Sequence, residues 1–95
     1  MSGVTGRPTA GARLVVEKAE ETAAAIVYRG VVHLPEADVP AEVTLALPGG
    51  AAQATLGEGG SPELEKAMAA LVRAATKGLL ASGGALPRKI VRWRP

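Results

Sequence analysis

Apolar and polar residues alternate along much of the first half of the chain, which is the pattern of β-strands with one buried face. The β pattern begins at Ala12 and returns over residues 25–34. The clearest alternation follows at residues 42–47, and a weaker strand is expected over residues 52–56. Pro48-Gly49-Gly50 lies between these two strands and is typical of a hairpin turn. The chain up to residue 57 therefore predicts an antiparallel meander of three or four strands.

The second predicted strand has a glycine near its centre. Gly30 shares one face of this strand with Ile26, Tyr28 and Val32, and His33 lies on the other face. A glycine inside a strand has no side chain to pack, and it often marks a bulge or the close approach of another backbone. We therefore expect one of these two features at Gly30.

Helical periodicity replaces the alternation after residue 60. Ser61 is a favoured N-cap residue, and Pro62 is favoured at the first helical position. Acids lie in the first turns and Lys77 lies near the other end, as the helix dipole favours. Gly83-Gly84 is expected to end the helix. The apolar stripe is predicted to consist of Leu64, Met68, Leu71, Val72, Ala75 and Leu79.

The segment Arg88–Arg94 places four cations around Trp93. Ile90, Arg92 and Arg94 alternate with Lys89, Val91 and Trp93. This alternation, with β-branched and aromatic residues at its centre, favours a final strand whose Trp packs on the sheet or the helix. The alternative is a free cationic tail that binds an anionic partner.

Together these elements predict a small two-layer α+β domain. One long helix packs on the meander, and a C-terminal strand joins the sheet. The Gly-, Ser- and Thr-rich residues 1–11 are expected to form a flexible N-terminal arm, and residues 12–95 to form the single domain. Phe is absent, and Tyr28 and Trp93 are the only aromatic residues. Such a core is thin, so burial of apolar surface in a homo-oligomer is a reasonable expectation.

Charge divides the chain into two unequal parts. Residues 1–65 hold all nine carboxylates and four cations, a net charge of −5. Residues 66–95 hold seven cations and no acid, a net charge of +7. Such a division indicates either a basic region that binds an anionic partner or an internal pairing that cancels in the folded chain.

The candidate chemistry of the chain is sparse. There is no Cys, His33 is the only His and Asp38 is the only Asp. A catalytic relay through His33 would need a serine, and no serine lies in a nucleophile-elbow context. The Gly-rich loop before Ser61 lacks the Lys-Ser/Thr of a phosphate-binding loop. We therefore expect no catalytic residue, no metal and no cofactor, and no small-molecule substrate is indicated.

The expected location and partners depend on features that the sequence lacks. The N-terminus shows no signal sequence, and Arg73 and Lys77 interrupt the most apolar stretch, so we expect a cytoplasmic protein without a membrane partner. The leading hypothesis is a small non-catalytic interaction or adaptor protein that acts through a sheet edge, self-association or the basic C-terminal segment. The alternative is a nucleic-acid-binding protein. In either case the candidate binding residues are Arg73, Lys77, Arg88, Lys89, Arg92, Trp93 and Arg94.

Overall fold

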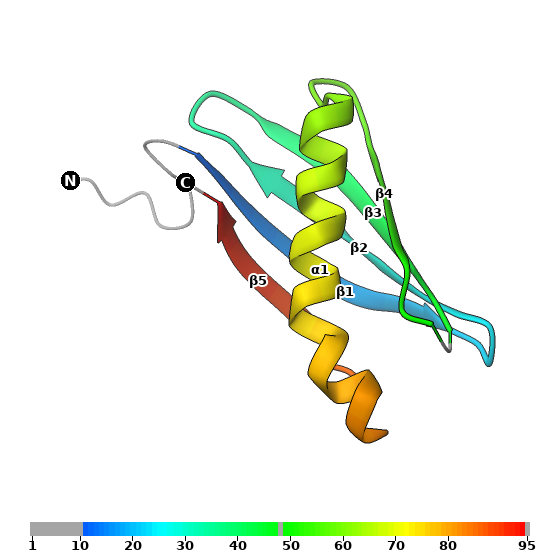
Figure 1. Cartoon of the computed structure of the whole chain (residues 1–95). Coiled ribbons are helices and arrows are strands. Elements are labelled where there is room, and N and C mark those ends of the chain that lie inside the picture. The colour runs from blue at the N-terminus through cyan, green and yellow to red at the C-terminus, as the bar shows by residue number, and fades with distance from the viewer. Residues whose placement is uncertain (1–10, 48, 95) are drawn as a thin grey trace.

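The computed structural model describes residues 11–47 and 49–94, which form one five-stranded sheet with one helix packed on it (Figure 1). The elements, in chain order, are β1 (Ala12–Glu21), β2 (Ala25–His33), β3 (Asp38–Ala46), β4 (Ala52–Leu56), α1 (Pro62–Ser82) and β5 (Lys89–Arg94). The strand order is β4-β3-β2-β1-β5, and every neighbouring pair is antiparallel. The predicted α+β class is therefore confirmed. The predicted flexible arm lies, apart from Gly11, outside the described residues.

The last strand is a paired member of the sheet and not a free tail. The chain leaves the sheet at one edge with β4, crosses one face as α1 and returns at the opposite edge as β5 (Figure 1). Leu14 lies opposite Arg92, and Val16 lies opposite Ile90. The alternation in residues 89–94 thus indicated the correct element.

The core lies between α1 and one face of the sheet. Its buried side chains are Ala12, Leu14, Val16, Ile26, Tyr28, Val32, Val39, Ala41, Val43, Leu45, Ala54, Met68, Val72 and Ile90. Thr76 is also buried, and its hydroxyl donates to the carbonyl oxygen of Val72 (2.9 Å), which removes the cost of burying it. Leu79 is 36% exposed, so the predicted stripe was wrong at its C-terminal end, where α1 extends past the sheet.

Gly30 allows β1 and β2 to approach each other closely. It lies opposite Val16, and a Cβ at this position would overlap the carbonyl oxygen of Val15 and lie 2.7 Å from Val16 Cα. The close approach predicted for this glycine is therefore confirmed. The irregularity in the β1–β2 pairing lies elsewhere, between Lys18 and Glu20.

Both ends of α1 are capped as the sequence indicates. Ser61 Oγ accepts from the backbone N–H of Leu64 (3.1 Å), and Gly83 adopts the left-handed conformation with φ 73°. The segment after the helix is held to the sheet by Tyr28, whose hydroxyl donates to the carbonyl oxygen of Pro87 (2.8 Å). Burial, and secondarily the charge of Glu21, raises the pKa of Tyr28.

Candidate interaction surfaces

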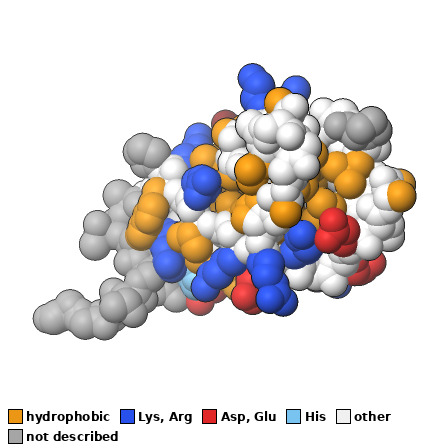
Figure 2. Space-filling model, turned by 90° about the horizontal axis from the view of Figure 1, so that it is seen from below, with side chains coloured by type: hydrophobic (Ala, Val, Ile, Leu, Met, Phe, Trp, Pro, Cys, Tyr) orange, Lys and Arg blue, Asp and Glu red, His pale blue; other side chains and the backbone are white. Residues whose placement is uncertain are grey.

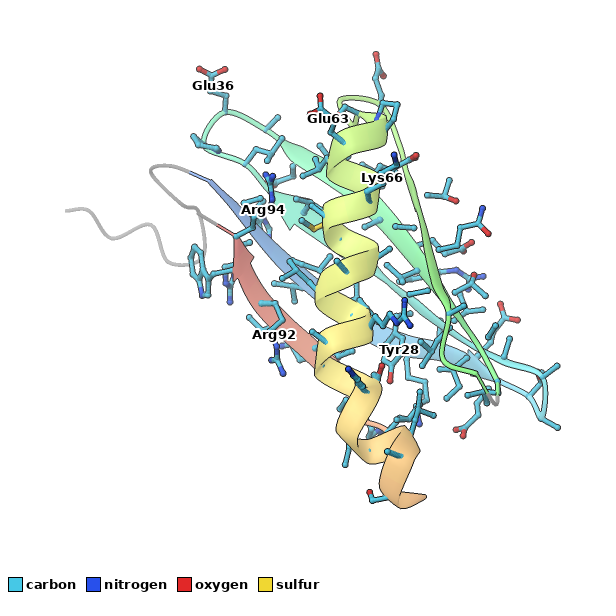
Figure 3. All side chains as sticks on the ribbon, in the orientation of Figure 1. Tyr28, Glu36, Glu63, Lys66, Arg92 and Arg94 are labelled. Carbon is cyan, nitrogen blue, oxygen red and sulfur yellow. The ribbon has the colours of Figure 1, made fainter. Side chains whose placement is uncertain are left out.

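The candidate binding residues do not form one site. Arg73 and Lys77 belong to α1, and Arg88 precedes β5. Arg92 and Arg94 share a side of β5 with the buried Ile90, so they lie on the helix side of the sheet (Figure 3). Lys89, Val91 and Trp93 lie on the opposite side. We call this opposite side, which no described helix covers, the uncovered face.

An apolar row crosses the uncovered face from the β5 edge to β3. Val91 lies opposite Val15, Val15 opposite Val31, and Val31 opposite Pro40. The three valines are half-buried by their neighbours, and Pro40 is exposed. The row therefore offers apolar surface between a row that contains His33 and Asp38 and a row that contains Arg29 and Glu42.

Trp93 lies at one end of the uncovered face. It is directly opposite Arg13 on β1, and the guanidinium carbon of Arg13 lies 5.4 Å from the centroid of the indole ring, a cation–π contact. Trp93 keeps 56% of its surface exposed, so it packs on the sheet without being buried. Sequence reasoning missed Arg13, because only the β1–β5 register brings the two residues together.

Glu20, Glu21 and Glu42 form ion pairs with cations from the same part of the chain, residues 12–42. Arg29 bonds through Nε to Glu42 (2.7 Å) and through Nη2 to Glu20 (2.7 Å), and these hydrogen bonds raise the pKa of Arg29. Lys18 pairs with Glu21 at 3.1 Å. These pairs are exposed, so each contributes little to stability.

The cations of residues 66–94 form no ion pair with a carboxylate within the described ranges. They are Lys66, Arg73, Lys77, Arg88, Lys89, Arg92 and Arg94. Figure 2 shows the end of the molecule where α1 terminates, with Lys and Arg side chains spread over it and few acids among them. The excess positive charge of this segment is thus displayed on the surface and is not cancelled by internal pairing.

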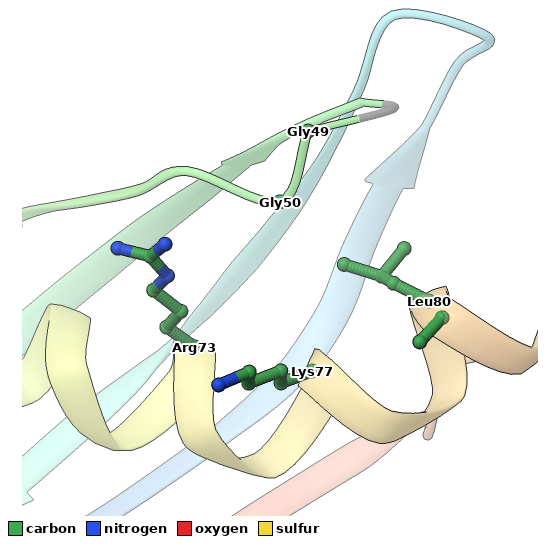
Figure 4. A pocket seen from close by; sticks show the side chains of 6 residues that line it. Gly49, Gly50, Arg73, Lys77 and Leu80 are labelled. Atoms are coloured by element: carbon green, nitrogen blue, oxygen red, sulfur yellow. The ribbon is translucent and has the colours of Figure 1, made fainter.

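A shallow groove runs along α1 beside strand β4. Its first hollow is lined by Gly49, Gly50, Arg73, Lys77, Leu80 and Ala81 (Figure 4). Two further hollows share Ala52, Lys66 and Ala69 as lining residues, and Arg73 links one of them to the first hollow. We call the whole depression the β4 groove. Each hollow measures about 260–280 Å³, below the usual range of small-molecule pockets.

Lys66 was not among the residues predicted for binding. The sequence places it on the polar side of α1, but only the packing of α1 against β4 shows that it lines the same groove as Arg73. Helix geometry spaces Lys66 and Arg73 by about 10 Å along the axis, and Arg73 and Lys77 by about 6 Å. The groove therefore carries a row of three cations, and the carboxylate of Glu65, which also lines it, is bonded to the backbone N–H of Leu56.

His33 and Asp38 are the one pair that resembles part of a catalytic relay. They lie opposite each other on β2 and β3, with Nδ1 of His33 2.8 Å from Oδ1 of Asp38. Both face away from α1, whereas Ser61 caps that helix, and Ser82 Oγ donates to Leu79 O at its other end. Neither described serine is thus placed to be activated by His33.

Within residues 11–47 and 49–94, no three His, Asp or Glu side chains lie together as a metal site would require. No helix of this same part of the chain combines the length and the apolar character needed to cross a bilayer. Comparison with protein families, curated proteins and solved structures found no match to this chain.

Proposed function

We propose that this chain is a non-catalytic interaction protein that binds a protein partner through its sheet. The observation that carries the proposal is the uncovered face, where an apolar row ends beside an exposed Trp93 stacked on Arg13. Tryptophan and arginine are the residues most enriched at binding hot spots, and apolar surface at the centre of a polar rim is the usual anatomy of an interface.

The size of this face sets the expected strength of binding. Five strands about 4.8 Å apart give a width of about 20 Å, and strands of five to ten residues give a length of about 17–33 Å. The face then offers on the order of 500 Å² per partner, at the lower end of the range for specific interfaces. We therefore expect a reversible complex, either with another protein or with a second copy of the chain.

The experiment compares two variants that each place a lysine on the uncovered face. Val31→Lys lies in the apolar row, whereas Thr55→Lys lies on β4, outside that row. Sedimentation and light scattering would show whether the wild type self-associates, and capture from the source cell would show other partners. The proposal predicts that Val31→Lys abolishes the association and that Thr55→Lys keeps it. Equal behaviour of the two variants would contradict it.

Nucleic-acid binding is the second candidate, and the exposed cations of residues 66–94 favour it. Within the described ranges these cations have no carboxylate partner, so their full charge is open to phosphates. The affinity for an oligonucleotide should then fall steeply as salt rises from about 50 to 200 mM. It should also weaken in Arg92→Ala or Arg94→Ala without a change in melting temperature. The absence of binding at low salt would exclude this function.

A further inference from the structure

The two edges of the sheet differ in how well they are protected against pairing with a further strand. The β5 edge bears Lys89, Arg92 and Arg94, and charged side chains on an edge strand oppose the pairing of another strand. Strand β4, with the sequence Ala-Gln-Ala-Thr-Leu, has neither a charge nor a proline. No described strand pairs with its outer side. The β4 edge is therefore the one that can accept a further strand.

The backbone of β4 shows which groups are available there. Ala51 O accepts from Ala46 N, and Gly57 N donates to Pro40 O, so the odd-numbered residues of this stretch bond towards β3. The even-numbered residues Ala52, Ala54 and Leu56 then direct their backbone groups outward. The N–H of Leu56 donates to Glu65 Oε2 (3.0 Å), which satisfies the donor at that end. The opening thus comprises the N–H and C=O groups of Ala52 and Ala54 and the C=O of Leu56.

The same opening lies beside the cations of the β4 groove. Ala52 lines two of the hollows together with Lys66, and one of these hollows also reaches Arg73. In a strand added along β4, every second side chain would face α1, at intervals of about 6.8 Å. Acidic side chains at those positions would be spaced similarly to the cations of α1. The long Lys and Arg side chains can span the remaining difference in spacing.

We propose that the outer edge of β4 binds an extended acidic peptide segment as a sixth strand, with its carboxylates directed at Lys66, Arg73 and Lys77. Main-chain hydrogen bonds to Ala52 and Ala54 hold the segment, and the cations select its charge. The inference rests on the proposed role as an interaction protein and assigns this edge a partner chemistry of its own.

Charge also decides against the other occupants of this edge. Pairing of β4 with β4 of a second copy would bring two rows of three cations towards each other, which like-charge repulsion opposes. A nucleic acid would satisfy the cations but would bring no regular row of N–H and C=O groups for Ala52 and Ala54. A peptide supplies both.

The probe is a fluorescein-labelled heptapeptide of alternating Glu and Thr with blocked ends, and its binding is measured by fluorescence anisotropy at low salt. We expect saturable binding that is at least tenfold weaker for the same peptide with Gln in place of Glu. A peptide N-methylated at the residues that face β4 should also lose at least tenfold, because it cannot donate to the edge. This last control leaves the protein unchanged, so it does not depend on the folding of a variant.

Variants of the protein locate the site. Ala52→Pro removes an outward N–H without taking a bond from β3, and the double variant Lys66→Gln/Arg73→Gln removes charge from the groove. Each should weaken binding about tenfold, whereas Arg92→Gln/Arg94→Gln at the opposite edge should leave it unchanged.

The inference is overturned by equal affinity for the Glu and Gln peptides, by unchanged binding of the N-methylated peptide, or by no binding at low salt. It is also overturned if a single-stranded oligonucleotide binds in the groove more tightly than the peptide and is lost with Lys66→Gln/Arg73→Gln. Val31→Lys separates the two proposals, since it should disrupt association through the uncovered face and leave peptide binding intact.

Discussion

Two Gly→Ala substitutions should change stability in opposite directions, although the chemical change is the same. At Gly30, an added Cβ would overlap backbone atoms of Val15 and Val16 on β1. At Gly78, inside the exposed side of α1, an added Cβ would meet nothing within 4 Å. The first substitution introduces a clash that no side-chain rotation can relieve, and the second only favours the helix.

The magnitudes follow from these surroundings. Relief of the overlap at Gly30 requires β1 and β2 to separate locally, which lengthens several ladder hydrogen bonds worth about 1 kcal/mol each and loosens the packing of neighbouring core residues. We expect Gly30→Ala to lower the free energy of unfolding by at least about 3 kcal/mol, a large part of the stability of a small domain. Gly78→Ala should raise it by about 0.8–1 kcal/mol, the difference in helix propensity between the two residues.

Urea denaturation followed by far-ultraviolet circular dichroism measures both changes on one scale. A Gly30→Ala protein that is already unfolded without urea agrees with the expected loss. The reasoning about the close β1–β2 approach would be refuted by a loss below about 1 kcal/mol with an unchanged fold. If Gly78→Ala is not stabilised, the assignment of that position to an unobstructed helix surface is wrong.

Three further outcomes are expected from urea denaturation. Because the pKa of Tyr28 is raised above its ordinary value of 10.0, the folded state keeps this proton where the unfolded state loses it. The contribution of Tyr28 to the free energy of unfolding should therefore be fully present below pH 10 and be lost as pH rises from there to the raised pKa. Tyr28→Phe should reduce this dependence of stability on pH. An equal dependence in the variant and the wild type would contradict the burial of the phenol. Trp93→Ala should cost only about 1–2 kcal/mol, less than the 3–5 kcal/mol typical of a buried Trp, and a larger cost would mean that the ring is buried. Ser61→Ala should cost about 1 kcal/mol through loss of the N-cap, with Thr55→Ala, at an exposed strand position, as the control that should change stability by less.

Much of the fold could be predicted, because most of its elements carry local signals. The alternation in residues 42–47 and the N-cap and C-cap of α1 depend on the periodicity and backbone preferences of neighbouring residues. The end of strand β1 could not be located, because its polar residues 17–21 fit either a turn or an exposed strand end when read alone. Its pairing with β2 keeps this end extended, and that pairing is not a local property.

The arrangement of the candidate binding residues could be predicted only in part, because most of it depends on register and packing. The alternation alone already places Arg92 and Trp93 on opposite sides of a strand. Residues remote in sequence, such as Arg13 and Trp93, lie in contact. The joining of Lys66 to Arg73 in one groove required the position of α1 over β4, which periodicity alone does not give.

The position of β5 at the far edge has a consequence for how the chain reaches its folded state. Strand β1 is made before β5, but β5, residues 89–94, forms one of its two neighbours. While the chain is being synthesised, β1 therefore remains an open edge, although Leu14 and Val16 belong to the core. Contacts between residues so distant in sequence slow folding and leave partly folded chains prone to aggregate. The growing chain is thus expected to be most vulnerable just before β5 is added.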